Sequence, residues 1–120
     1  MLQHHSEPLD LAFQALSDPG RRAMVERLSF GPASVSELAQ PLPMTLSAVV
    51  QHLKVLEEAG LVTSRKIGRV RTCALEIKAM TQIEAWIVER KRFWERQYDQ
   101  LDAYLARTAP EKTAPEETDP

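Results

Sequence analysis

The residues best suited to chemistry lie between positions 45 and 54, where short polar, small apolar and basic side chains recur at helical spacing. Ser47, Val50 and Gln51, with Lys54 one turn further on, fall on one face of a helix. Hydroxyl and amide groups can hydrogen-bond the edges of bases, a small apolar group can touch a thymine methyl, and a lysine can reach a phosphate. These side chains predict a surface for the major groove of double-stranded DNA.

A helix delimited by Thr45 and Gly60 would position this face. Thr45 is a good N-cap because its hydroxyl can accept a hydrogen bond from a free amide of the first turn, and Gly60 can adopt the left-handed conformation that ends a helix. Another face carries an apolar stripe at helical spacing, formed by Val49, Leu53 and Leu56. We interpret this segment as a recognition helix whose stripe packs into the core.

A short helix directly before Thr45 would brace the recognition helix. Ser34 and Glu37 have the spacing of a capping box, in which each side chain bonds the other residue's amide. Pro41 ends this helix because the residue before a proline is pushed out of the helical region. Only the tight connection from Pro41 to Met44 separates the two helices, and this predicts a helix-turn-helix.

A β-hairpin should follow the recognition helix. The runs 61–67 and 70–75 are rich in β-branched residues and flank Gly68 and Arg69, although Gly-Arg is a weaker turn pair than Asn-Gly. All four charged residues between Leu61 and Leu75 are basic: Arg65, Lys66, Arg69 and Arg71. This +4 segment predicts a wing that grips the DNA backbone or reaches into a minor groove. The acidic end of the chain, at 109–120 with a charge of −3, masks it within the net charge of −2.

Two further helices are expected before the helix-turn-helix, and one long helix after the wing. Apolar spacing predicts a short helix from Leu9 to Leu16, and Asp18 followed by Pro19 begins a second helix that runs to about Phe30. The last helix, about 78–106, shows more apolar surface than a small domain can cover, so it should pack on a second copy together with the first helix. The expected interface residues are Leu9, Phe13, Ile83, Ile87, Trp94, Tyr98, Leu101 and Leu105.

Length and composition fit one soluble domain. The chain has 120 residues, of which 43% are hydrophobic and 27% charged, and no apolar run is long enough to span a membrane, so we expect neither a membrane anchor nor a signal peptide. We expect a mobile N-terminus at 1–8, a domain at 9–106 and a disordered acidic tail at 107–120. The single cysteine agrees with a cytoplasmic location. The fold class expected is mainly α with a small β-hairpin.

Three segments resemble the ArsR/SmtB family of winged helix-turn-helix transcriptional regulators. They are 15–28 (A-L-S-D-P-G-R-R-A-M-V-E-R-L), 46–62 (L-S-A-V-V-Q-H-L-K-V-L-E-E-A-G-L-V) and 68–71 (G-R-V-R). The resemblance covers about residues 9–105, and 92–105 is similar to a branch of the family that lacks the metal sites. It implies a homodimeric repressor that binds an inverted repeat in its own operator region.

Two departures from the family pattern change what is expected of metal binding and of the contacts with DNA bases. Metal-sensing members carry C-V-C where this chain has Ser34-Val35-Ser36, and the last helix contains no histidine. Serine does not replace a soft thiolate ligand, so we expect no metal site, and we expect no cofactor. Serine is usual in the family at Val50, and a polar residue is frequent at Leu46. Base reading is therefore expected to be more apolar here.

The residues assigned to DNA contact all belong to the recognition helix, with its N-cap, or to the wing. They are Thr45, Ser47, Ala48, Val50, Gln51, His52, Lys54, Arg65, Lys66, Arg69 and Arg71. His52 also suits local packing or, less simply, metal ligation. Cys73 alternates with Leu75 and should be a small buried hydrophobe, with a redox role as the alternative.

Two alternatives concern the whole protein. Phe93, Trp94 and Tyr98 could line a pocket for an unknown small-molecule effector, although an aromatic stripe at helical spacing is more typical of a core or interface. The winged helix could also serve only as a protein-interaction module. The sequence offers no nucleophile, base and orienting residue for an enzyme.

Overall fold

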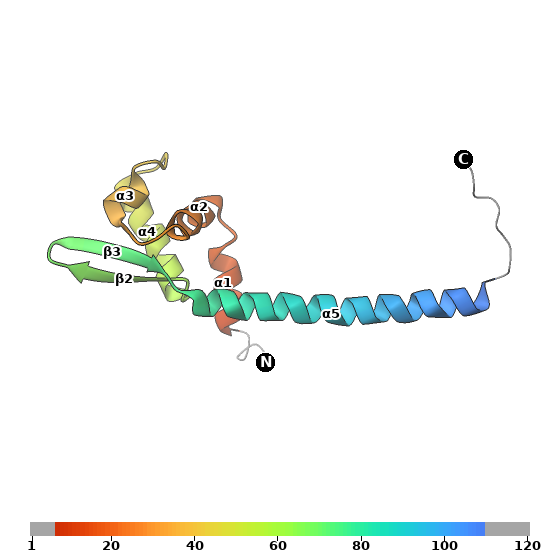
Figure 1. Ribbon diagram of the computed structural model, residues 1–120. Helices are drawn as coiled ribbons and strands as arrows, with labels where there is room; N and C mark the ends of the chain where they lie inside the picture. Colours follow the sequence, from red (N-terminus) through yellow and green to blue (C-terminus); the bar gives the residue numbers. More distant parts are fainter. Residues whose placement is uncertain (1–6, 110–120) are drawn as a thin grey trace. The chain divides into compact units, whose positions relative to one another are not determined.

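The computed structural model describes residues 7–109 of the chain. In these residues the elements follow one another as α1 (Glu7–Ala15), α2 (Pro19–Leu28), β1 (Ala33–Ser34), α3 (Val35–Ala39), α4 (Leu46–Glu58), β2 (Val62–Ile67), β3 (Val70–Leu75) and α5 (Ile77–Thr108) (Figure 1). The fold is mainly α with a small antiparallel sheet. The expected fold class, a winged helix-turn-helix, is confirmed.

The sheet has one strand more than the sequence predicted. Its order is β1-β3-β2, with Ala33 opposite Cys73 and Ser34 opposite Thr72. A strand of two residues contains too little alternation to be visible in the sequence. It matters because it joins the start of α3 to the wing hairpin, which β2 and β3 form as expected.

The caps expected from the sequence are present. Thr45 Oγ1 accepts from the amide of Ala48 at 3.1 Å, and Ser34 and Glu37 form both bonds of the capping box. Gly60 has a φ of 77°, and the amides of Gly60 and Leu61 donate to the carbonyls of Glu57 and Leu56. This is a Schellman ending, which turns the chain sharply from α4 into β2.

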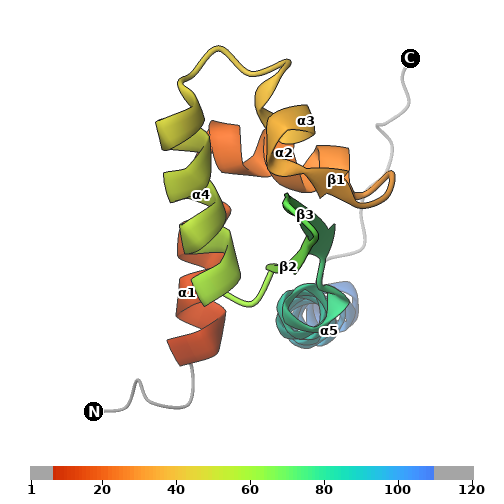
Figure 2. The same cartoon turned by 90° about the vertical axis from the view of Figure 1, so that its left-hand side faces the viewer.

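A core lies among the helices of the first part of the chain and the inner side of the sheet. Its largest fully buried side chains are Met24, Leu38, Val49, Leu56, Leu61, Val62 and Cys73. α1, α2 and α3 each contact α4, and Figure 2 shows α1 beside the carboxyl half of α4. The recognition helix is therefore held from several sides.

Several expected boundaries are wrong by a few residues. α1 begins at Glu7 instead of Leu9, α2 ends at Leu28 instead of Phe30, and α5 continues to Thr108. The segments expected at 1–8 and 107–120 are therefore helical at their inner ends. Residues 1–6 and 110–120 lie outside the described residues.

The contacts of the chain group into two compact units, Met1–Ala85 and Trp86–Pro120, and the single domain expected at 9–106 stays a prediction. The second unit contains most of α5, on which side chains from Trp86 onward are exposed. An isolated helix has few long-range contacts, which accounts for the division. Among residues 7–109, none of the helices combines the length and the apolar character needed to cross a membrane.

Candidate nucleic-acid interface

The two faces of α4 differ as the sequence predicted. Val49 and Leu56 are fully buried, whereas Val50 is 50% and Leu46 57% exposed. Ser47, Gln51 and Lys54 are exposed as well, and Ala48 is half-buried. The outer face therefore presents hydroxyl, amide, aliphatic and ammonium groups together, the combination that base edges, thymine methyls and phosphates require.

α3 braces this helix from the side. Leu38 of α3 is 1% exposed and belongs to the same core as Val49 and Leu53. Direct contact between α3 and α4 closes the helix-turn-helix. α4 is therefore buried on one side by the core and by α3, which leaves its outer face free for a partner.

The register of the wing divides its basic residues between two faces. Directly paired residues of an antiparallel ladder share a face of the sheet, and Ser64 lies opposite Cys73, and Lys66 opposite Arg71. Ser64 Oγ donates to Glu57 Oε2 of α4 at 2.5 Å, so this face is directed at the recognition helix. Arg65 alternates with its neighbours and lies on the other face, and Arg69 lies in the turn.

A hollow of about 300 Å³ separates the recognition helix from the wing. Its lining residues are Val35, Val50, Leu53, Lys54, Glu57 and Arg71. The cations of Lys54 and Arg71 therefore border one concave surface, although they come from different elements. The carboxylate of Glu57, which accepts from Ser64, also lines the hollow, so the two cations exceed the one anion and favour an anionic backbone.

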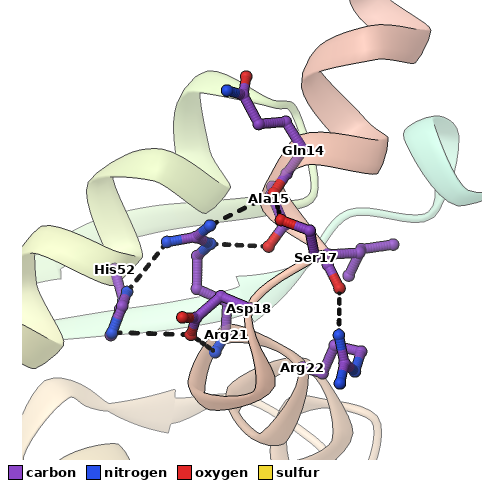
Figure 3. A network of polar contacts seen from close by, with 8 residues as sticks. Gln14, Ala15, Ser17, Asp18, Arg21, Arg22 and His52 are labelled. Atoms are coloured by element: carbon purple, nitrogen blue, oxygen red, sulfur yellow. Dashed lines mark hydrogen bonds and ion pairs between the residues drawn. The ribbon is translucent and has the colours of Figure 1, made fainter.

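His52 lies in a polar network that the sequence did not reveal (Figure 3). Its Nδ1 is 3.2 Å from Arg21 Nη1, and its Nε2 is 3.8 Å from Asp18 Oδ2. The imidazole thus faces two residues at the start of α2. Asp18 and Arg21 were visible in the sequence only as a cap and its neighbour, because contacts between distant segments leave no local pattern.

Asp18 caps α2 as expected. Its carboxylate accepts from the amide of Arg21 at 3.0 Å, and this bond, with the nearby His52 and Arg21 side chains, holds the pKa of Asp18 below its usual value. Because the folded-state pKa is lowered, the stabilisation by this cap is present above the ordinary pKa of 3.8 and is lost as the pH falls through the lowered value.

Cys73 is fully buried in the core, as predicted. Burial, and then the carboxylate of Glu57, raise the pKa of the thiol. The thiolate is the reactive form of cysteine, so this environment opposes the redox alternative.

The described residues contain no group of three or more histidine, cysteine, aspartate or glutamate side chains that could hold a metal ion. At the position of the family's thiolate motif, Ser34 Oγ accepts from the amide of Glu37 at 3.1 Å. This serine therefore serves as a helix cap.

The outer part of α5 exposes its expected interface residues. Trp94 and Tyr98 stack with ring centroids 5.2 Å apart, yet they are 62% and 54% exposed. Ile87, Leu101 and Leu105 are also about half exposed. In the first unit, Phe13 is 39% exposed, and Leu9 and Ile83 are partly buried. An aromatic stack in this setting presents a flat apolar surface.

Comparisons with known proteins agree with this geometry. A helix-turn-helix domain family matches residues 16–65. The HTH-type transcriptional regulator Rv2034 of Mycobacterium tuberculosis is 48% identical over 87 residues, which cover 72% of this chain and 78% of that protein.

Solved structures extend the similarity to the whole fold. The crystal structure of the ArsR family transcriptional regulator RHA00566 is 50% identical, with a TM-score of 0.71 over 74% of this chain and 98% of the other. The ArsR-like transcriptional regulator from Rhodococcus sp. RHA1 is 27% identical, with a TM-score of 0.73 over 91% of this chain and 99% of the other. Sequence and fold agree over most of the chain, which therefore belongs to the ArsR/SmtB family of DNA-binding transcriptional regulators.

Proposed function

We propose that the protein is a homodimeric repressor that binds an inverted repeat in double-stranded DNA. The observation that carries this proposal is the exposed outer face of α4, which borders the same hollow as the basic inner face of the wing. Ser47, Ala48, Val50 and Gln51 contact base edges, and Thr45 and Lys54 contact phosphate. The wing supplies Arg65, Lys66, Arg69 and Arg71 to the backbone.

The wing residues differ in how directly they support the proposal. Lys66 and Arg71 lie on the face directed at α4, so they reach the same stretch of DNA as the recognition helix. Arg69 in the turn reaches the flanking backbone. Arg65 lies on the outer face of the sheet, which makes its contact the weakest of the four.

The exposed apolar residues of α5 support dimerisation. Apolar side chains at spacings of three, four and seven along one stripe of a helix are typical of a helix that packs on another. Ile83, Ile87, Trp94, Tyr98, Leu101 and Leu105 of α5, with Leu9 and Phe13 of α1, would be covered by a second copy. Two copies related by a dyad place two recognition helices in successive major grooves, with centres about 10 base pairs apart.

The remaining roles follow from the DNA partner. A DNA-binding regulator of this kind acts in the cytoplasm, and it needs neither a cofactor nor a catalytic residue. An apolar small-molecule effector would bind at the aromatic side chains of Phe93, Trp94 and Tyr98. The competing function is a protein-interaction module without specific DNA binding, against which the exposed, basic groove argues.

The test is selection from a pool of genomic fragments by the purified protein, followed by sequencing of the bound DNA. The expected result is enrichment of an inverted repeat whose half-sites are separated by about one helical turn, or 10 base pairs. Retention of fragments without a shared sequence, or of none even at low salt, would reject the repressor and favour the interaction module.

A further inference from the structure

The junction of α1, α2 and α4 leads to an inference that rests on the proposed function. We propose that Arg21 is a positioning residue for DNA reading: it ties His52, and with it the recognition helix, to the carboxyl end of α1. Arg21 itself does not touch DNA. Its loss would lower discrimination between sequences and leave the general attraction to DNA in place.

Arg21 spans three segments with one guanidinium group (Figure 3). Nε donates to the carbonyl of Ala15 at 2.7 Å, Nη2 to the carbonyl of Gln14 at 3.3 Å, and Nη1 to His52 Nδ1 at 3.2 Å. The two carbonyls belong to the last turn of α1, where carbonyl groups lack partners within the helix. Because the guanidinium group is planar and its N–H donors are fixed in direction, the direction of each hydrogen bond is also fixed.

The chemistry of the guanidinium assigns the tautomer of His52. Arginine has donors only, so His52 Nδ1 must accept, and the ring proton lies on Nε2. Nε2–H is then directed at Asp18 Oδ2, 3.8 Å away. Both ring nitrogens face residues at the start of α2, and the side chain is 23% exposed. We therefore assign His52 a positioning role in place of the direct DNA contact expected from the sequence.

Gly20 shows how closely this junction is packed. A Cβ atom at Gly20 would lie 3.0 Å from Asp18 Oδ2, 3.0 Å from Met44 Cε and 3.6 Å from His52 Nε2. A side chain here would press on the carboxylate and on the loop that leads into α4. The glycine thus lets the start of α2 approach the recognition helix.

The position of His52 makes the tie relevant to base reading. His52 follows Gln51 directly, and Val50 is also within one turn, so a rotation or shift of α4 at His52 moves the exposed reading face. Contacts to base edges require placement to within about 0.5 Å. Because α1 belongs to the proposed dimer interface, the same tie relates dimer packing to the reading face.

The experiment compares Arg21→Gln with Arg22→Gln. Arg22 also ties α2 to the end of α1, since Nη1 donates to the carbonyl of Leu16 at 2.7 Å, but that bond does not involve α4. Both variants lose one positive charge. The measured quantity is the ratio of affinities for the selected operator and a scrambled duplex, over a salt series. Arg21→Gln should lower the ratio about tenfold with the salt slope unchanged, and Arg22→Gln should leave the ratio unchanged.

A second pair of variants keeps the test independent of the folding of Arg21→Gln. In His52→Asn the amide oxygen can replace Nδ1 as the acceptor for Arg21, whereas His52→Ala removes the acceptor. The asparagine variant should retain most of the discrimination that the alanine variant loses, and Arg21→Gln combined with His52→Ala should cost no more than either alone. Dimer stoichiometry and thermal unfolding are measured for every variant.

The outcomes separate the two proposals. Equal discrimination in wild type, Arg21→Gln and His52→Ala would overturn the positioning role and leave the repressor intact. Additive losses would mean that Arg21 and His52 act independently, and a changed salt slope with Arg21→Gln would mean that Arg21 contacts DNA; either result would also overturn the positioning role. A wild-type protein that fails to distinguish the operator from scrambled DNA would reject the proposed function, and the positioning role with it.

Discussion

The residues of α4 fall into two groups: those that pack the helix against the core and those proposed to contact the bases of DNA. Gln51 is exposed and carries the one side-chain amide on the reading face. Gln51→Ala should lower discrimination by about 1–3 kcal/mol at one base pair, because an amide can bond adenine at two points. The check is a panel of operators with single substitutions. Unchanged preference at every position would remove Gln51 from the reading face.

The thiol of Cys73 offers a test of the core at the same scale. Its pKa is raised above the ordinary value of 9.0, so the folded protein keeps a proton that the unfolded chain loses. The stability that Cys73 contributes is fully present below the unfolded-state pKa and is lost as the pH rises through the folded-state pKa. The difference in unfolding free energy between wild type and Cys73→Ala should therefore shrink as the pH rises above the ordinary pKa of 9.0. A constant difference would contradict this, as would rapid alkylation of the native protein.

The environment of a residue could be predicted from the sequence only where its contacts come from residues nearby in the chain. The burial of Val49 and the exposure of Val50 follow from helical spacing alone. The contact between Arg21 and His52 joins residues that are 31 positions apart in the sequence, and no local pattern encodes it. For His52 the sequence therefore left packing, phosphate contact and metal ligation open.

The wing is the element whose register makes the sharpest prediction. Arg71 and Arg65 lie near each other on neighbouring strands but on opposite faces of the sheet. Arg71→Ala should weaken binding to all DNA sequences and reduce the salt slope by about 1, and Arg65→Ala should have a smaller effect. Arg69→Ala should resemble Arg71→Ala because the turn faces the flanking backbone. Equal effects of Arg65 and Arg71 on the salt slope would contradict the assignment of the two faces.

The helices could be predicted best where a capping residue marks the start of the helix. Thr45, Ser34 and Asp18 begin helices in the structure as they do in the pattern, since each cap is a local bond. β1 escaped prediction because its existence depends on pairing with residues of β3 that come 38 and 40 positions later, Thr72 opposite Ser34 and Cys73 opposite Ala33. Its two residues make the sheet continuous with the start of α3.

At the scale of the molecule, the exposed stripe of α5 predicts a dimer that the DNA-binding geometry needs. Leu101→Asp places a charge on the stripe, whereas Gln100→Asp adds the same charge at the neighbouring position, outside the stripe. Leu101→Asp should shift the protein to monomers and remove high-affinity operator binding, because burying an unpaired charge costs several kcal/mol. Light scattering and operator titration measure both effects. A dimeric, fully active Leu101→Asp would show that α5 does not form the interface.

The division of the chain into two units was not predicted, although its cause lies in the sequence. The apolar stripe of the last helix indicated a partner, and the side chains from Trp86 to Ala109 are exposed within one copy. Charge also acts at this scale. A net charge of −2 coexists with a basic wing because acidic residues lie elsewhere in the chain.

The central claim, specific binding of DNA by a dimer, is tested most directly by one titration. The purified protein is titrated against a duplex with its selected inverted repeat and against a scrambled duplex, across a salt series, with stoichiometry from light scattering. We predict nanomolar affinity for the repeat, a steep loss of affinity with salt and one dimer per site. Equal and weak binding to both duplexes, with one monomer per site, would contradict it.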